Sequence, residues 1–109
     1  MATTYKVLGQ VNPSATTATT LYTVPSATQA VISTISVTNQ AGTAATFRIA
    51  VRPAGAALAA QHYIVYGATV PASDATFFTL GLTLAATDVV TVYASSANLS
   101  FNAYGSEIA

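Results

Sequence analysis

The sequence has no cysteine and very little charge. Its 109 residues include three Lys or Arg, three Asp or Glu and one His, so 6% are charged and the formal net charge is zero. Roughly a quarter of the residues are charged in ordinary soluble domains. Without cysteine there can be no disulfide framework and no thiolate metal site. We expect no nucleic-acid partner, because binding a phosphate backbone needs more Lys and Arg than this chain carries.

Long apolar runs are also missing. No stretch approaches the ~18 consecutive apolar residues that a membrane-spanning helix needs. The opening, MATTYKVLG, lacks the basic segment followed by an apolar one that is typical of a secretory signal. We therefore expect no membrane partner and no signal peptide. Together with the lack of cysteine, these features favour assembly in a reducing cytoplasm.

The residues that are present are mainly apolar or hydroxyl-bearing. The hydrophobic fraction is 52%, which with so little charge is the reverse of a disordered composition. A chain of this length supports one core, so residues 1–109 are predicted to form a single domain. A soluble monomer usually stays apart from its neighbours through surface charge. We therefore expect this protein to assemble, as a homo-oligomer or on a larger partner.

One stretch, residues 45–70, organises the rest of the chain. In its first half Phe47, Ile49 and Val51 alternate with polar or small residues, which predicts a strand with one buried face. Arg48 and Arg52 share the opposite face, about 13 Å apart. The strand ends at Pro53, and residues 61–66 are predicted to return as a second strand.

The remaining chain predicts further short strands separated by turns. An alternating or β-branched pattern covers residues 4–11, 20–24, 30–39, 76–84, 89–95 and 99–105. About eight strands with turns every ~8–12 residues predict an all-β fold, an antiparallel β-sandwich or jelly roll. Residues 1–20 are expected to form either an extended N-terminal arm or the first strand.

Two hairpins are expected beyond the central pair of strands. Residues 30–39 should pair with the strand that follows at Phe47, and residues 89–95 with residues 99–105. In the strand 76–84, the even positions Phe78, Leu80, Leu82 and Leu84 are expected to face the core. Asp74 and Asp88 precede strands, where aspartate commonly bonds the backbone of its own turn.

His62 is the only histidine and the first candidate for catalysis or metal binding. A metal site needs several converging ligands, and the chain offers one His, two Asp and one Glu. No G-x-S-x-G element accompanies it to supply a serine nucleophile. We interpret His62 as a structural or interface residue. The chain is predicted not to be an enzyme, and to need no metal, cofactor or small-molecule ligand.

The arginines and tyrosines are the better candidates for a binding surface. Arg48 and Arg52 are either solvated residues or anchors for carboxylates of another subunit. Tyr63 and Tyr66 suit a subunit interface or a stacking surface for sugars. Three positions apart on a regular strand, these two tyrosines should face opposite sides. The predicted subunit or capsid interface comprises Arg48, Arg52, His62 and Tyr66.

The chain resembles a family of small virion proteins of tailed bacteriophages, common among phages of cyanobacteria. The resemblance extends from about Leu21 to Ile108 and is carried by two runs, TFRIAVRPAGAALAAQHYIVYGATVP and DVVTVYASSANLSFNAYGSEI. It implies a structural β-sandwich protein of the particle. The main expectation is a capsid decoration (cement) protein, a homotrimer bound to the major capsid protein on the outside of the head. The alternative is a tail- or fibre-associated module that binds surface glycans.

Overall fold

The computed structural model describes residues 2–109, and eight strands account for most of them. The strands are β1 (Thr3–Val11), β2 (Thr19–Thr23), β3 (Gln29–Asn39), β4 (Ala45–Arg52), β5 (Tyr63–Val70), β6 (Ala75–Leu84), β7 (Val89–Ala94) and β8 (Leu99–Ile108). Two single 3₁₀ turns, η1 (Pro53–Gly55) and η2 (Ala60–His62), lie between β4 and β5. Within residues 2–109 no helix is long and apolar enough to cross a membrane.

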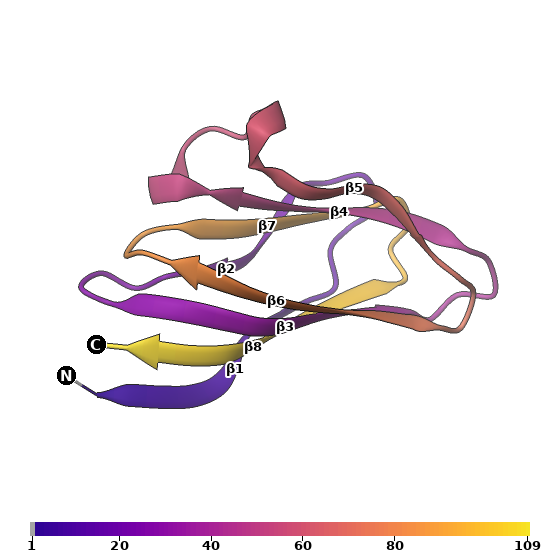
Figure 1. Ribbon diagram of the computed structural model, residues 1–109. Coiled ribbons are helices and arrows are strands. Elements are labelled where there is room, and N and C mark those ends of the chain that lie inside the picture. The colour runs from indigo at the N-terminus through magenta and orange to yellow at the C-terminus, as the bar shows by residue number, and fades with distance from the viewer. Residues whose placement is uncertain (1) are drawn as a thin grey trace.

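The strands form two antiparallel four-stranded sheets that pack face to face (Figure 1). The order is β1-β8-β3-β6 in the first sheet and β2-β7-β4-β5 in the second. Most consecutive strands alternate between the sheets, and this order is the double Greek key of a jelly roll. The prediction of an eight-stranded β-sandwich or jelly roll is confirmed. Residues 3–11 form an edge strand paired with β8 along its length.

Both additional hairpins predicted from the sequence are wrong. β3 pairs with β6 and β8, whereas β4 pairs with β5 and β7. β7 and β8 likewise belong to different sheets. In each case the short turn carries the chain from one sheet to the other, because each strand has to bury its apolar face against the opposite layer. The central pair, β4 and β5, is the antiparallel pair that the sequence predicted.

The core lies between the two sheets and is almost wholly apolar. Phe47 of β4 packs edge-on against Phe101 of β8 and Phe78 of β6, with ring centroids 6.1 and 5.8 Å apart. Such edge-to-face pairs add about 0.5–1.5 kcal/mol to the effect of area burial. Ile49 beside Phe47 has no exposed surface. The alternation that defined the buried face of β4 in the sequence is therefore confirmed.

The predicted core face of β6 is correct except at Leu80. Phe78 and Leu82 pack against the core and Leu84 is buried, but Leu80 is 39% exposed. The pairing of β3 with β6 shifts between Ile32 and Thr34, and Leu80 lies opposite this shift. An irregularity of this kind turns the following side chain to the other face, which strict alternation cannot anticipate.

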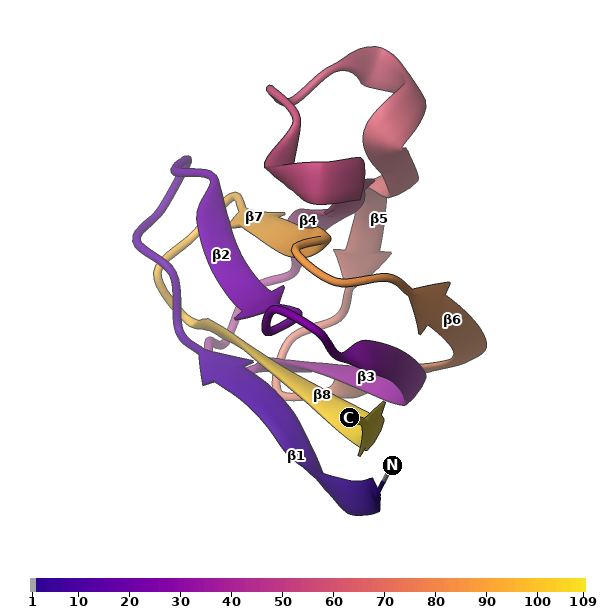
Figure 2. The same ribbon diagram turned by 90° about the vertical axis from the view of Figure 1, so that its left-hand side faces the viewer.

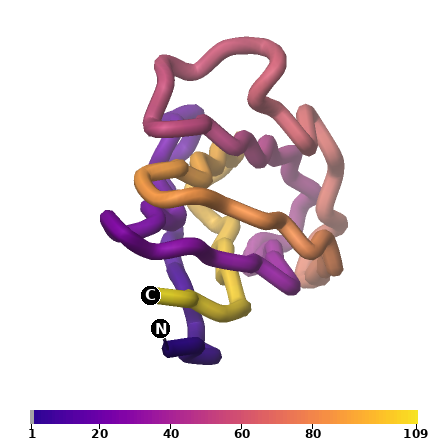
Figure 3. The backbone as a smooth tube through the Cα atoms, turned by 60° about the vertical axis from the view of Figure 1, so that its left-hand side comes forward, coloured from indigo at the N-terminus to yellow at the C-terminus, as the bar shows by residue number. Residues whose placement is uncertain are grey.

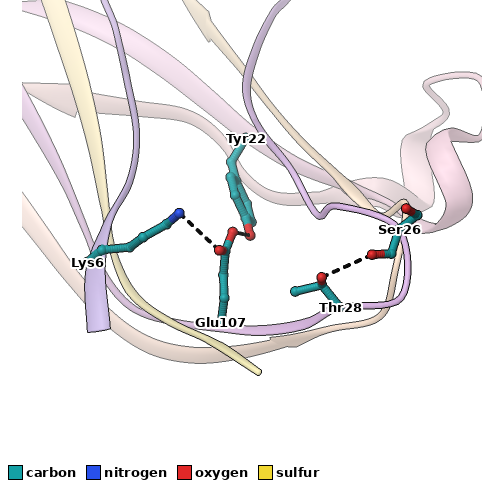
Figure 4. Close-up of polar contacts among 5 residues, drawn as sticks. All are labelled: Lys6, Tyr22, Ser26, Thr28 and Glu107. Carbon is teal, nitrogen blue, oxygen red and sulfur yellow. Dashed lines mark hydrogen bonds and ion pairs between the residues drawn. The ribbon is translucent and has the colours of Figure 1, made fainter. Parts of the chain in front are cut away.

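One polar cluster links the sheets near the chain termini (Figure 4). The Tyr22 hydroxyl of β2 donates to Oε2 of Glu107 in β8, and Lys6 Nζ of β1 lies 3.0 Å from Glu107 Oε1. The hydrogen bond from Tyr22, followed by the one from Lys6, holds the pKa of Glu107 below its usual value. Burial raises the pKa of Tyr22, and the hydrogen bond to Glu107 and its negative charge raise it further. In the adjoining turn Thr28 Oγ1 donates to the Ser26 carbonyl (3.1 Å).

The ends of the described chain lie side by side (Figure 3). The N–H of Ala2 donates to the carbonyl of Ala109 (2.8 Å), and the N–H of Ala109 donates to that of Ala2 (3.0 Å). These bonds continue the ladder between β1 and β8 beyond the last strand residues. The segment between β4 and β5 lies at the opposite side of the sandwich from these ends, as Figure 2 shows.

Candidate functional site

The outer face of β4 and β5 carries most of the residues that the sequence singled out. Arg48 is paired in register with Tyr66 of β5 on one side and with Tyr93 of β7 on the other. The connection between the two strands, residues 53–62, is called the 53–62 loop here. It lies at the end of the hairpin, standing clear of the sheet edges (Figures 1 and 2). Binding residues often occur on such loops when a rigid scaffold positions them.

Tyr63 and Tyr66 lie on the same face, contrary to the prediction. Their rings meet edge to face with centroids 4.9 Å apart. The reason is a register shift in the hairpin: Ala50 pairs with Tyr63 and Ile49 with Val65, so Ile64 is an extra residue in β5. A bulge of this kind reverses the alternation and brings both rings outward.

Gly67 allows a second irregularity just beyond Tyr66. The pairing shifts again between Phe47 and Arg48, and Gly67 has a φ of +74°. This left-handed conformation is accessible to glycine at little cost. Gly67 is therefore the extra residue of a second bulge, and the two shifts together fix the direction in which Tyr66 projects.

Arg52 is half-buried, and its guanidinium makes three hydrogen bonds to other residues of the same chain. Its Nε donates to the carbonyl of Ala56 (2.7 Å), its Nη2 to that of Gly55 (3.0 Å) and its Nη1 to Oγ1 of Thr91 (3.2 Å). Three bonds from one guanidinium hold the start of the 53–62 loop against β7. Arg52 therefore positions the loop.

Asp88 and His62 hold the same loop from two further directions. Asp88 accepts the N–H of Ala54 at Oδ1 (2.8 Å) and that of Ala85 at Oδ2 (2.9 Å). His62 is buried, and its Nδ1 accepts the N–H of Ala59 (3.0 Å). The bonds to Asp88 match its predicted role in a turn. With Nδ1 occupied by a backbone donor, His62 is placed as a structural residue of the loop.

Arg48 is held by aromatic rings and has no carboxylate partner among residues 2–109. Its Cζ lies 4.3 Å from the ring centroid of Tyr66 and 4.1 Å from that of Tyr93. The single ion pair among these residues is the one between Lys6 and Glu107. Each cation–π contact contributes about 0.5–1 kcal/mol when partly exposed. We call Arg48, Tyr66 and Tyr93 the Arg48 stack; its two rings hold a guanidinium that makes no hydrogen bond to another residue among 2–109.

An apolar hollow lies beside the Arg48 stack. Its volume is about 650 Å³, and its lining residues are Leu58, Ala59, Ala60, Tyr63 and Tyr66. Tyr66 is 64% exposed and Leu58 39% exposed. We call this feature the apolar hollow. Its volume is within the range of about 300–1,000 Å³ that is typical of ligand sites, although its lining offers few polar groups besides two phenols.

The four residues predicted to form an interface therefore separate into two pairs. Arg48 and Tyr66 come together at the surface, whereas Arg52 and His62 shape the loop from within. Sequence reasoning missed Leu58 as a site residue. The available signal was the apolar run AALAA between two strands, because loops that face only water are seldom so apolar.

The side chains at the site are suited to binding a carboxylate beside a small apolar group. No group of three or more His, Cys, Asp or Glu that could hold a metal occurs within residues 2–109. The groups at the site are one guanidinium, three phenols and aliphatic side chains. A fixed guanidinium can bind a carboxylate through two parallel hydrogen bonds, and the hollow beside it can bury a small apolar group.

Comparison with known proteins gives no family for this chain. No protein-family model matches it, and no curated protein matches it.

Proposed function

We propose that this protein is a structural component of a tailed-bacteriophage particle, a decoration protein that binds the outside of the assembled head. On this proposal it stabilises the junctions between capsomers and acts as a homotrimer. It is made in the cytoplasm of the host bacterium and ends in the virion. It catalyses no reaction, uses no cofactor and contacts neither nucleic acid nor membrane.

The observation that carries the proposal is a surface both apolar and nearly uncharged. The large exposed apolar side chains are Tyr5, Val7, Leu58, Ile64, Tyr66, Phe77, Leu80 and Tyr104. They lie on both sheets and, for Leu58, on the 53–62 loop, and the whole chain has only three basic and three acidic residues to keep it soluble. Large exposed apolar areas mark interaction surfaces in soluble proteins. A subunit with several covered sides accounts for such a surface better than an isolated molecule does.

The fold and the sequence resemblance support the same proposal. Jelly rolls recur in viral capsid proteins, although also in lectins and cupins, so the fold alone does not decide the function. The resemblance to small phage virion proteins covers most of the chain. A jelly roll with exposed apolar side chains on both sheets can contact two neighbours at once, which a protein that links capsomers has to do.

The proposed mechanism is stabilisation by selective binding. A protein that binds the assembled shell but not its free subunits stabilises the shell by about 2.7 kcal/mol per site at a hundredfold excess over its dissociation constant. Weak contacts that repeat over a lattice add through avidity. No covalent step is needed, which agrees with a site built for binding.

The proposal is tested by adding purified protein to heads that lack it. We expect saturable co-sedimentation with assembled heads, none with unassembled major capsid protein, and a higher temperature for release of packaged DNA. Equal binding to assembled and unassembled protein, or binding without any gain in head stability, would overturn the mechanism. Arg48→Ala is the useful variant here, because replacing Arg52 would also disturb the 53–62 loop.

A second function is favoured by the exposure of Tyr66 beside the apolar hollow. An exposed aromatic face can stack on a sugar ring, which suits a tail- or fibre-associated module that binds surface glycans. A glycan array probed with the purified protein tests this function. Binding that is lost in Tyr66→Ala would favour it, and an array without signal would remove it.

A further inference from the structure

The few ionised side chains of this protein can be followed individually, and most have partners within the chain. Lys6 binds Glu107; Arg52 binds loop carbonyls; both oxygens of Asp88 accept backbone N–H groups. Two groups of opposite charge remain: the guanidinium of Arg48 and one oxygen of Asp74. Neither group has an ion partner among residues 2–109, so both are free to pair with a group of another molecule.

On the positive side, Arg48 is held in place and still able to bind. Two rings fix its guanidinium at 4.3 and 4.1 Å, and none of its donors bonds to a residue among 2–109. No buried side-chain N or O atom in this part of the chain lacks a partner, so the donors of Arg48 reach solvent. A guanidinium with fixed orientation loses less rotamer entropy when it binds a carboxylate.

On the negative side, Asp74 lies in a small, rigid turn. Residues 71–74, called the 71–74 turn here, are all exposed. Two hydrogen bonds hold the turn. The N–H of Ser73 donates to the carbonyl of Ala41 (3.0 Å), and Asn39 Nδ2 donates to the carbonyl of Pro71 (3.2 Å). Asp74 Oδ1 accepts the N–H of Ala75 (2.7 Å), which leaves Oδ2 without a partner in residues 2–109.

The two surfaces match in chemistry. The 71–74 turn presents two small apolar residues, Pro71 and Ala72, next to a carboxylate. The site on β4 and β5 presents an apolar hollow of about 650 Å³ next to an unpaired guanidinium. Complementary charges fix the orientation of a contact, and burial of apolar groups beside them supplies affinity.

The two surfaces cannot meet within one molecule. The 53–62 loop lies at one end of the β4–β5 hairpin, and the 71–74 turn follows β5 at its other end (Figure 1). We propose that the 71–74 turn of a second copy occupies the apolar hollow, and that Arg48 donates to the Asp74 carboxylate of that copy. Each molecule then gives its turn to one neighbour and receives the turn of another.

This contact is head to tail and therefore has a defined consequence for assembly. An interface that joins two different surfaces forms closed rings when the rotation between copies closes, and open chains when it does not. A trimer of the kind expected for a decoration protein would be a closed ring with three such contacts. The inference concerns self-association alone and stands or falls independently of the virion assignment.

Charge reversal and its rescue test the contact. The full chain is measured by sedimentation velocity over a range of concentrations. We expect Arg48→Glu and Asp74→Arg each to weaken association by about tenfold or more, since a well-placed interface charge is worth over 1 kcal/mol. The double variant, Arg48→Glu with Asp74→Arg, restores the pair with its charges exchanged and should recover association.

Gentler variants separate loss of contact from loss of folding. Asp74→Asn keeps an oxygen for the Ala75 N–H and removes only the charge, so it should weaken association without lowering the melting temperature. Arg48→Gln should also weaken association, but it removes both ring contacts, so its melting temperature should fall slightly while the protein stays folded. Lys6→Gln is the matched control, because it removes one positive charge from another strand and should leave association unchanged.

The contrary results are equally defined. A wild-type protein that stays monomeric at high concentration overturns the proposal, as does association that neither charge reversal weakens. Single variants that weaken association without rescue in the double variant exclude Asp74 as the partner. If Arg48→Glu lowers binding to heads or glycans but leaves self-association intact, the hollow takes another occupant and the proposal is wrong.

Discussion

Replacing Tyr22 by Phe tests how the two sheets are linked. The change removes one hydroxyl and leaves the ring, so it creates no cavity in the core. The lost hydrogen bond ends on a charged acceptor, Glu107, whose side chain is only 14% exposed. Hydrogen bonds to charged groups contribute about 1.5–3 kcal/mol, so we expect the free energy of unfolding at pH 7 to be about 2 kcal/mol lower in the variant.

The pH dependence of this loss distinguishes the hydrogen bond from a general packing effect. The pKa of Glu107 is held below its usual value of 4.5 chiefly by Tyr22 and next by Lys6. A carboxyl with a depressed folded pKa stabilises the fold above its unfolded pKa, and this stabilisation is lost as the pH falls through the folded value. The free energy of unfolding should therefore differ most between wild type and Tyr22→Phe at pH 7, and the difference should be smaller at pH 3.

The assay is urea unfolding at the two pH values, followed by far-ultraviolet circular dichroism. Tyr104→Phe is the matched control, because Tyr104 is 38% exposed and its hydroxyl bonds to nothing in residues 2–109. Surface changes of that kind stay within about 0.5 kcal/mol. A Tyr22→Phe loss no larger than the control, or one of the same size at pH 7 and pH 3, would refute the reasoning.

Three further changes should have equally direct effects. Gly105→Ala should lower stability by about 4 kcal/mol or prevent folding, since its new methyl group would collide with the Val31 carbonyl oxygen; thermal unfolding measures this. Arg52→Ala should speed amide hydrogen exchange in the 53–62 loop while the sheets stay protected, and uniform exchange would contradict its role. Because the pKa of Tyr22 is raised in the folded state, its contribution to the free energy of unfolding is complete below pH 10.0 and is lost as the pH rises further. Urea unfolding above pH 10.0 should show this loss in the wild type and not in Tyr22→Phe.

The strands could be predicted from the sequence because alternation is a local property. Phe47 and Ile49 had to be buried once residues 45–52 formed a strand, and they are. The partners of each strand were not predictable in the same way. Short turns at residues 40–43 and 96–98 predicted hairpins, but both connections pass between sheets, since the core needs contacts between distant segments.

The arrangement of the candidate site could not be predicted from the local sequence pattern. Two register shifts in the β4–β5 hairpin place Tyr63 and Tyr66 on one face, and nothing in the alternation signals them except Gly67. Arg48 and Arg52 are equivalent by spacing, four residues apart on one strand. Only the folded loop distinguishes them, because its carbonyls engage Arg52 and leave Arg48 available.

The most direct test of the proposed function is the copy number of this chain in purified phage particles, measured against the major capsid protein and combined with cryo-electron microscopy. The proposal predicts many copies in a fixed ratio to the major capsid protein, located as trimers on the outside of the head. A few copies confined to the tail, or none in the particle, would contradict it.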